Sequence, residues 1–312
     1  MGKEKIRILE KKVDILYSRL ENCDLCPRNC RVNRLRGEKG WCGIEKEIVV
    51  YTSFLHQGEE PPLSGKNGSG AIFFSGCNLK CIYCQNFKFS HFIQGKVFKV
   101  EELATLMLEL QSKGAHNINL VTPTHIIPQI FASLLIAYQK GLNLPIVYNT
   151  SGYEKEEVID LQKEIIDIYL VDLRYIDSYL AQKYSSAPDY PQINKRILKK
   201  IYKFKKYRWQ IGLLKEGLIV RHLVLPSYTE KSKKILCWIK ENLPEVLVSI
   251  MFQYQPYFKA KYFFEINRPL NYREYLEIKK YAEKLDLNGW LQGFNPPKEL
   301  AGVNFLPFEK NK

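Results

Sequence analysis

The sequence predicts an α/β protein, a partial (β/α)6 barrel with a small cysteine-rich, metal-binding module at its N-terminus. From residue 70 onward, short apolar runs alternate with longer amphipathic stretches, which is typical of βαβ units and a parallel sheet. The runs lack strict alternation of apolar and polar residues, as expected of strands covered on both faces. Seven of the eight cysteines lie between Cys23 and Cys84, and such clustering in a cytosolic protein favours metal binding over disulfides.

Six apolar runs are the predicted strands, and the predicted helices lie between and after them. The strands are expected at 71–75, 117–121, 145–149, 167–172, 218–225 and 246–252. The helices are expected near 101–113, 126–140, 154–164, 192–210, 229–242 and 271–285. In a barrel of this kind, functional residues are expected at the carboxyl ends of the strands.

The N-terminal segment has a different character. Residues 4–21 carry the apolar periodicity of a helix, whereas 22–43 are rich in cysteine, arginine and glycine and predict loops held by metal. A turn-rich stretch with two prolines and three glycines follows at 61–70. We therefore divide the chain into an N-terminal helix and cysteine-rich module, 1–64, and a core barrel with C-terminal helices, 65–312.

The chain is basic, with 47 lysines and arginines against 33 acidic residues and a net charge of +14. Its densest basic run, Lys195 to Arg208, predicts either the solvated face of an amphipathic helix or an RNA-binding strip. The longest apolar stretch, Ile126 to Tyr138, is too short to span a bilayer, and the N-terminus has no signal-peptide pattern. We expect a cytoplasmic protein without a membrane partner.

Three cysteines follow the first predicted strand with the spacing C-x3-C-x2-C. They are Cys77, Cys81 and Cys84. Three thiolates can hold a [4Fe–4S] cubane and leave its fourth iron without a protein ligand, whereas structural clusters usually have four cysteine ligands. An open iron can bind and activate a small molecule, by the logic that keeps catalytic zinc sites open. The alternatives are a zinc knuckle and three buried thiols.

With this spacing directly after the first strand of a β/α pattern, the sequence resembles the radical S-adenosylmethionine (SAM) superfamily. Tyr83, just before the last cysteine, is part of the resemblance and is expected at the cofactor. The resemblance implies that the amino and carboxylate groups of SAM chelate the open iron of the cluster. One electron then cleaves the C5′–S bond, and the 5′-deoxyadenosyl radical so formed abstracts hydrogen from a substrate.

Further segments are similar to the pyruvate formate-lyase activating-enzyme branch, and most of all to an uncharacterised iron–sulfur group within it. These segments are 60–65, 69–86, 117–125, 146–153, 167–175 and 219–226. The resemblance implies an oxidoreductase that acts on a protein or peptide, as a glycyl-radical activase does. It also implies an electron donor such as flavodoxin or ferredoxin.

SAM is expected to lie across the strand ends. After the second strand many relatives carry Gly-Gly-Glu, which binds the SAM amino group. Here Thr122 and Thr124 occupy that place, and their hydroxyls and the local backbone carbonyls are the expected substitutes. Asn149 and Ser151 follow the third strand, where they either bond the ribose hydroxyls or cap a turn before the next helix.

The later strands contribute charged and amide side chains. Asp172 and Arg174 resemble the Asp-x-Lys element of the activating enzymes, which implies an aspartate near SAM and an arginine on the SAM carboxylate. The alternative is an Asp–Arg surface pair. Arg221, inside the fifth strand, is expected to face the barrel mouth, whereas the neighbouring His222 is equally suited to the core. The activating enzymes carry a histidine near SAM after strand six. This chain has no histidine there, so Gln255 takes that role or the role is vacant.

A second group of cysteines precedes the barrel. Cys23, Cys26, Cys30 and Cys42 supply four thiolates, which suit either structural Zn²⁺ or a closed iron–sulfur cluster such as a second [4Fe–4S]. A loop-rich stretch with few large apolar residues needs such a staple to hold its shape. Unmetallated thiols are the remaining alternative.

Three functions are compatible with these patterns. The first is a radical enzyme acting on a protein or peptide, which we rank ahead because of the branch resemblance. The second is radical modification of RNA or a nucleotide-like small molecule, for which the net charge is the motive. The third is an iron–sulfur electron carrier without turnover, which the open-iron triplet disfavours.

Overall fold

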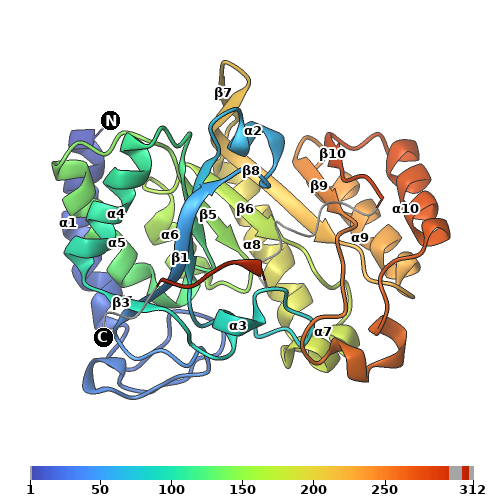
Figure 1. The fold of residues 1–312 in the computed structure, drawn as a ribbon, viewed down its shortest axis with the longest axis horizontal. Coiled ribbons are helices and arrows are strands. Elements are labelled where there is room, and N and C mark those ends of the chain that lie inside the picture. Colours follow the sequence, from blue (N-terminus) through green and yellow to red (C-terminus); the bar gives the residue numbers. More distant parts are fainter. Residues whose placement is uncertain (1, 295–303, 309–312) are drawn as a thin grey trace.

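The structure is a computed structural model that describes residues 2–294 and 304–308. Its centre is a parallel sheet in the order β2-β4-β5-β6-β8-β9, as expected for a partial barrel. These strands span Ser69–Phe74 (β2), Ile118–Val121 (β4), Ile146–Thr150 (β5), Ile168–Asp172 (β6), Leu213–Leu223 (β8) and Leu247–Met251 (β9). Each lies within a few residues of a predicted strand except that β8 begins earlier, so the predicted fold class is confirmed (Figure 1).

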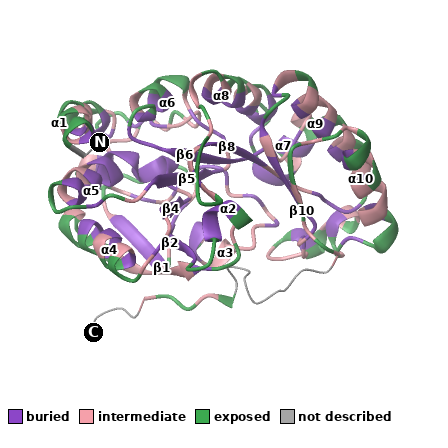
Figure 2. Cartoon of the chain, turned by 90° about the horizontal axis from the view of Figure 1, so that it is seen from above, coloured by how far each residue is buried: buried purple, intermediate pink, exposed green. Residues whose placement is uncertain are grey.

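Helices cover the outer side of this curved sheet, with α6, α8 and α9 in a row along it (Figure 2). The barrel helices are Val100–Ser112 (α4), Ile127–Gln139 (α5), Glu156–Gln162 (α6), Ser178–Ser185 (α7), Tyr190–Phe204 (α8), Thr229–Asn242 (α9) and Tyr272–Lys284 (α10). Their apolar faces and the outward side chains of the strands form one buried core. The helix expected at 192–210 is α8, which ends at Phe204 because the chain turns into a hairpin there.

Three strands and three short α-helices of the described residues lie outside the predicted elements, and one further strand replaces the end of the helix predicted at 192–210. The three strands are Ile48–His56 (β1), Lys96–Phe98 (β3) and Gly289–Leu291 (β10), and the strand within 192–210 is Arg208–Gln210 (β7). The helices are Pro61–Ser64 (α2), Phe87–Ser90 (α3) and α7. β1 runs antiparallel between β2 and β3, β7 pairs with the start of β8, and β10 adds a parallel strand beside β9. The sheet therefore extends beyond the six predicted strands at both edges.

The N-terminal segment is continuous with the barrel. Helix α1, Gly2–Ser18, packs against α5, and Leu9 and Leu16 belong to the same buried cluster as the barrel helices. β1 shares the barrel sheet although it precedes residue 64. The division into 1–64 and 65–312 stays a prediction, and part of its second unit lies outside the described residues. Among the described residues, no helix has the length and apolar character required to cross a membrane.

Candidate active site

A cavity of about 460 Å³ opens at the carboxyl ends of the parallel strands and reaches into the barrel. Its wall includes side chains from the loop after β2 and from the ends of β5, β6, β8 and β9. The predicted site residues on this wall are Cys77, Cys81, Tyr83, Cys84, Thr122, Asn149, Ser151, Asp172, Arg174, Arg221 and Gln255. Residues spread over 179 positions of the sequence thus meet at one place because parallel strands end at the same edge.

The loop after β2 presents its three thiols to the cavity. It leaves the strand at Gly76, whose φ of 85° lies in the region that favours glycine. A Cβ at this position would also lie 2.9 Å from the carbonyl oxygen of Cys42, so the loop passes tightly against the N-terminal segment. The backbone N–H groups of Leu79 and Lys80 donate to Sγ of Cys77 at 3.3 and 3.4 Å. These bonds fix the start of the loop and favour a thiolate there.

The other two thiols receive hydroxyl donors. Ser185 Oγ lies 3.0 Å from Sγ of Cys81, and Ser90 Oγ lies 3.4 Å from Sγ of Cys84. Burial raises the pKa of Cys77, and it raises the pKa of Cys84 to about 12. A metal or cluster would offset this cost, because a coordinated thiol is deprotonated outright. The buried thiols therefore suit ligands better than free nucleophiles.

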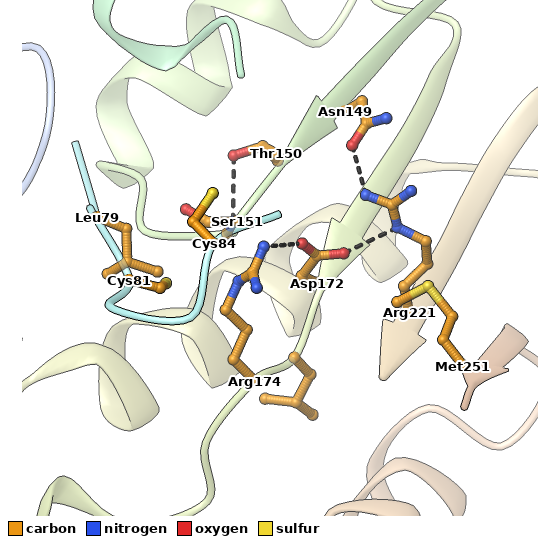
Figure 3. Close-up of polar contacts among 12 residues, drawn as sticks. Leu79, Cys81, Cys84, Asn149, Thr150, Ser151, Asp172, Arg174, Arg221 and Met251 are labelled. Atoms are coloured by element: carbon orange, nitrogen blue, oxygen red, sulfur yellow. Dashed lines mark hydrogen bonds and ion pairs between the residues drawn. The ribbon is translucent and has the colours of Figure 1, made fainter. Parts of the chain in front are cut away.

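A charged network crosses the ends of β5, β6 and β8 (Figure 3). The strand register places Asp172 directly opposite Arg221. Arg221 donates from Nε to Asp172 Oδ1 at 2.8 Å and from Nη2 to Asn149 Oδ1 at 2.5 Å. Arg174 donates from Nη2 to the second oxygen, Asp172 Oδ2, at 2.5 Å. One aspartate is thus held between two arginines, which orients its carboxylate at the cavity.

Four buried polar atoms of the wall residues have no hydrogen-bond partner within the part of the chain that the structure describes. Two of them are Arg174 Nε and Ser151 Oγ. Buried polar atoms are normally satisfied, so two orphans on one cavity wall mark places where a polar ligand would bond. Figure 3 shows Arg174 between Asp172 and the cysteine loop, with Ser151 nearby. The pair therefore lines the cavity, with Asp172 buried and Arg174 partly buried, rather than forming an Asp–Arg pair on the open surface.

Of the two threonines predicted to replace Gly-Gly-Glu, one lines the cavity and the other lies in the protein interior. Thr122 lines the cavity and has φ of 63°, a strained value for a β-branched residue. Its N–H donates to the carbonyl of Asn149 at 2.9 Å, which fixes this conformation. Thr124 lies outside the cavity wall, and its hydroxyl donates to Glu154 Oε1 at 2.6 Å. Thr124 therefore supports the fold behind the cavity instead of facing a ligand.

The two neighbours on β8 face opposite ways, as strand geometry requires. Arg221 lines the cavity, whereas His222 is buried behind it. The ring nitrogens of His222 lie 2.8 Å from the carbonyl oxygen of Leu173 and 2.9 Å from Ser232 Oγ. Burial lowers the pKa of His222 to about 4, so it is a neutral core residue.

Sequence reasoning missed an acidic part of the wall. Glu59 and Glu60 come from the segment after β1, and Glu59 Oε2 lies 3.5 Å from Arg221 Nη1. Burial raises the pKa of Glu60 to about 7, and its Oε2 has no partner. His56, at the end of β1, lines the cavity as well, and burial lowers its pKa to about 4. In the sequence, Glu59 and Glu60 appear only as a pair of glutamates before two prolines, and this pattern does not indicate a role for them.

The second cysteine group lies outside the cavity wall, in loops that precede β1. Its members are Cys23, Cys26, Cys30 and Cys42. Burial raises the pKa of Cys26 and of Cys42, and neighbouring thiols of the group add to the effect in both cases. Among the described residues, no three His, Cys, Asp or Glu side chains are placed to hold one metal ion together. This applies to both cysteine groups.

Comparison with known proteins identifies the fold. The pattern of the radical SAM superfamily matches residues 71–239. An uncharacterised protein of Methanocaldococcus jannaschii is 33% identical over 294 residues, which cover 91% of this chain and 81% of that protein. Streptococcus suis SuiB bound to its precursor peptide SuiA has a TM-score of 0.49 at 13% identity, covering 70% of this chain and 46% of SuiB.

A radical SAM methyltransferase of Sphaerobacter thermophilus also has a TM-score of 0.49, at 10% identity over 72% of this chain and 66% of that one. This chain thus spans less than half of SuiB and about two thirds of the methyltransferase. At these scores the two structures carry no conclusion about the substrate.

Proposed function

The chain belongs to the radical SAM superfamily, whose enzymes use a [4Fe–4S] cluster and SAM, and we propose that it abstracts hydrogen from a protein or peptide substrate. The observation that carries this proposal is the convergence of Cys77, Cys81 and Cys84 on one cavity with room beside them. When bound there, the cluster and SAM supply a 5′-deoxyadenosyl radical, formed by one-electron cleavage of the C5′–S bond with release of methionine. A donor such as flavodoxin or ferredoxin provides the electron.

The wall residues orient SAM in this proposal. Arg174 turns its unpaired Nε to the SAM carboxylate, while Asp172 holds its Nη2. Ser151 Oγ and the amide of Asn149 bond the ribose hydroxyls. Thr122 offers its backbone to the amino group, and Tyr83 and Gln255 flank the cofactor. Each assignment uses a group that lines the cavity, and the most specific ones use its orphaned polar atoms.

A peptide suits the shape of the cavity rim. Trp290, Leu291 and Gln292 belong to this wall, and the first two lie in β10. Within the described residues, β10 pairs with β9 on one side only, so it is an edge strand of the sheet. An extended peptide can add to such an edge through main-chain hydrogen bonds. This would lead a target residue along the rim toward the thiol loop.

The basic run that motivates an RNA substrate lies elsewhere. Residues 195–204 of the run lie in α8 in the outer helix layer (Figure 2), residues 205–208 follow this helix, and none of them belongs to the cavity wall. Lys200 pairs with Asp160 at 2.8 Å, and Lys195 and Lys199 lie over the ring of Trp238. Solvated and paired lysines of this kind are ordinary on a helix surface. RNA modification is therefore the second candidate, supported by net charge alone.

The test is anaerobic reconstitution with iron and sulfide, reduction, addition of SAM and measurement of 5′-deoxyadenosine. The proposal expects 5′-deoxyadenosine and methionine in equal amounts from the wild-type protein. A chain that holds its cluster but forms neither product is an electron carrier. RNA binding that weakens steeply with salt, together with RNA-dependent product formation, would favour the second candidate over a peptide.

A further inference from the structure

We propose that Cys23, Cys26, Cys30 and Cys42 hold a closed [4Fe–4S] cluster that packs directly against the loop of Cys77, Cys81 and Cys84. This inference goes beyond the proposed function and does not depend on the substrate. It also commits to iron–sulfur where the spacing of the four cysteines leaves zinc open, and the metal content of the variants described below distinguishes the two. Burial, charge, sulfur bonding and the contacts between the two loops carry it.

A buried arginine shows that this site holds negative charge. Arg34 is 1% exposed, and its Nε and Nη1 donate to the carbonyls of Glu45 and His125, both at 2.7 Å. Its Nη1 also lies 3.9 Å from Sγ of Cys23, and its Nη2 has no partner. The described residues offer this guanidinium no carboxylate. A buried cation requires a nearby anion, and thiolates held by metal supply that charge.

The loops are shaped around the sulfur atoms. The N–H of Trp41 donates to Sγ of Cys30 at 3.2 Å, and hydrogen bonds to cysteine sulfur are a feature of iron–sulfur sites. Gly40 approaches so closely that a Cβ there would lie 3.1 Å from the same sulfur. Cys42 is buried, and its Sγ lies 3.9 Å from the carbonyl oxygen of Ile44. Polar groups therefore lie against the sulfur atoms of Cys23, Cys30 and Cys42, of which Cys23 and Cys42 are buried.

The arrangement favours a cubane over zinc. Four thiolates on one Zn²⁺ converge on a single ion at about 2.3 Å each. No three side chains of the described residues are placed in that way. A cubane binds each thiolate through a different iron, so its ligands stand farther apart. Cys77, Cys81 and Cys84 are likewise not placed around a single ion, and we assign these three residues to the [4Fe–4S] cluster of the superfamily.

Arg28 joins the second site to the first. It lies between Cys26 and Cys30 in sequence and donates from Nε to the carbonyl of Asn78 at 2.9 Å and from Nη2 to Ser185 at 2.9 Å. Its guanidinium stacks on Trp41, 4.1 Å from the ring centre. Asn78 stands between the first two ligands of the SAM-cluster loop. One side chain thus binds one cysteine loop to the backbone of the other.

The test measures the iron and zinc content of full-length variants after anaerobic reconstitution. Wild type should hold about eight irons, and Cys77→Ala/Cys81→Ala/Cys84→Ala should keep about four irons without stoichiometric zinc. The triple variant retains every proposed ligand of the second cluster, so its iron count does not depend on folding of an altered module. Cys26→Ala should also fall to about four irons. Cys237→Ala, which removes the one cysteine in neither group, should keep eight.

The reduced triple variant should give the electron paramagnetic resonance spectrum of a [4Fe–4S]⁺ cluster. About one zinc and no iron in that variant would overturn the proposal in favour of a structural zinc site. About two irons would indicate a [2Fe–2S] centre and overturn the cubane. Neither metal would mean that the four thiols are not ligands. The metal content and the spectrum do not depend on SAM cleavage. This inference can therefore be contradicted while the proposed function stands, and the reverse is also true.

Discussion

The two cysteine loops lie side by side but are built for different purposes. The thiols of Cys77, Cys81 and Cys84 form part of the cavity wall, next to the charged network on β6 and β8. The four N-terminal thiols are outside that wall, with Arg34 beside Cys23 and the N–H of Trp41 on Cys30. Three thiolates on a cubane leave one iron open to a small molecule, whereas four thiolates leave none. Ligand number and access to the cavity are therefore the two features by which we distinguish a reactive cluster from the closed cluster proposed for the N-terminal cysteines.

Removing a ligand of the open loop should have the largest effect. Cys81→Ala should reduce 5′-deoxyadenosine formation to background, because a thiol of this cluster is lost and Ser185 keeps no sulfur partner. The melting temperature should change by only a few degrees, since the barrel core is built elsewhere. Cys237→Ala is the matched control and should keep full activity. Wild-type product formation by Cys81→Ala would contradict the assignment of the open cluster.

The charged network should contribute to SAM affinity. Arg174→Ala should raise the SAM dissociation constant about 10- to 150-fold, corresponding to about 1.5–3 kcal/mol for a charge-assisted contact. Equilibrium binding measured with the reconstituted protein checks this. Arg174→Lys should recover part of the affinity because the charge remains while the bidentate geometry is lost. Arg196→Ala, on the outer surface of α8, is the control, and an equal affinity in all four proteins would assign Arg174 a structural role.

The contact between the two loops can be weakened alone. Arg28→Ala removes the donors to Asn78 and Ser185 and should lower the free energy of unfolding by about 2 kcal/mol. Limited proteolysis should cut residues 22–43 sooner, while the iron count stays near that of wild type. Arg36→Ala, an exposed arginine of the same segment, is the control. Unchanged stability and protease resistance in Arg28→Ala would show that the loops are held together by other contacts.

The smallest effect is expected at a carboxylate remote from both loops. Burial disfavours the charge of Glu274, but bonds from Arg268 and from the N–H groups of Asn271 and Ser227 outweigh it and lower the pKa to about 2. Its contribution to stability is complete above the unfolded-state pKa near 4.5 and is lost as pH falls toward 2.

Glu274→Gln should therefore flatten the stability profile between pH 5 and 2 by about 1 kcal/mol, allowing for solvent screening. Denaturation at several pH values measures this. Iron content and SAM cleavage at neutral pH should not change. A loss of iron in Glu274→Gln would mean that the effects assigned to the cysteine loops are not local.

Sequence reasoning worked where the signal is local. Six apolar runs gave the six barrel strands, and the C-x3-C-x2-C spacing needed only eight consecutive residues. β1 was missed because its residues lie between the cysteine-rich stretch 22–43 and the turn-rich stretch 61–70, where no strand was expected. β10 was missed because three residues carry no periodicity. Strand order then explains how distant wall residues meet.

The rest depends on contacts that leave no pattern in the sequence. Arg28 reaches the carbonyl of Asn78, 50 positions away, and a backbone acceptor has no residue signature. Thr122 keeps a left-handed conformation without being a glycine, because the carbonyl of Asn149 holds its N–H. The orphaned atoms of Ser151 and Arg174 appear only once burial is known. Partners of this kind follow from packing and not from residue type.

The response of each cluster to SAM distinguishes an open iron from a closed cluster. Electron paramagnetic resonance spectra of the reduced protein are compared with and without SAM in two variants, Cys26→Ala and Cys77→Ala/Cys81→Ala/Cys84→Ala. The signal of Cys26→Ala, which keeps the open cluster, should change when SAM is added. The signal of the triple variant, which keeps the closed cluster, should stay the same. A SAM-dependent change in the triple variant, or none in Cys26→Ala, would contradict the distinction between an open and a closed cluster.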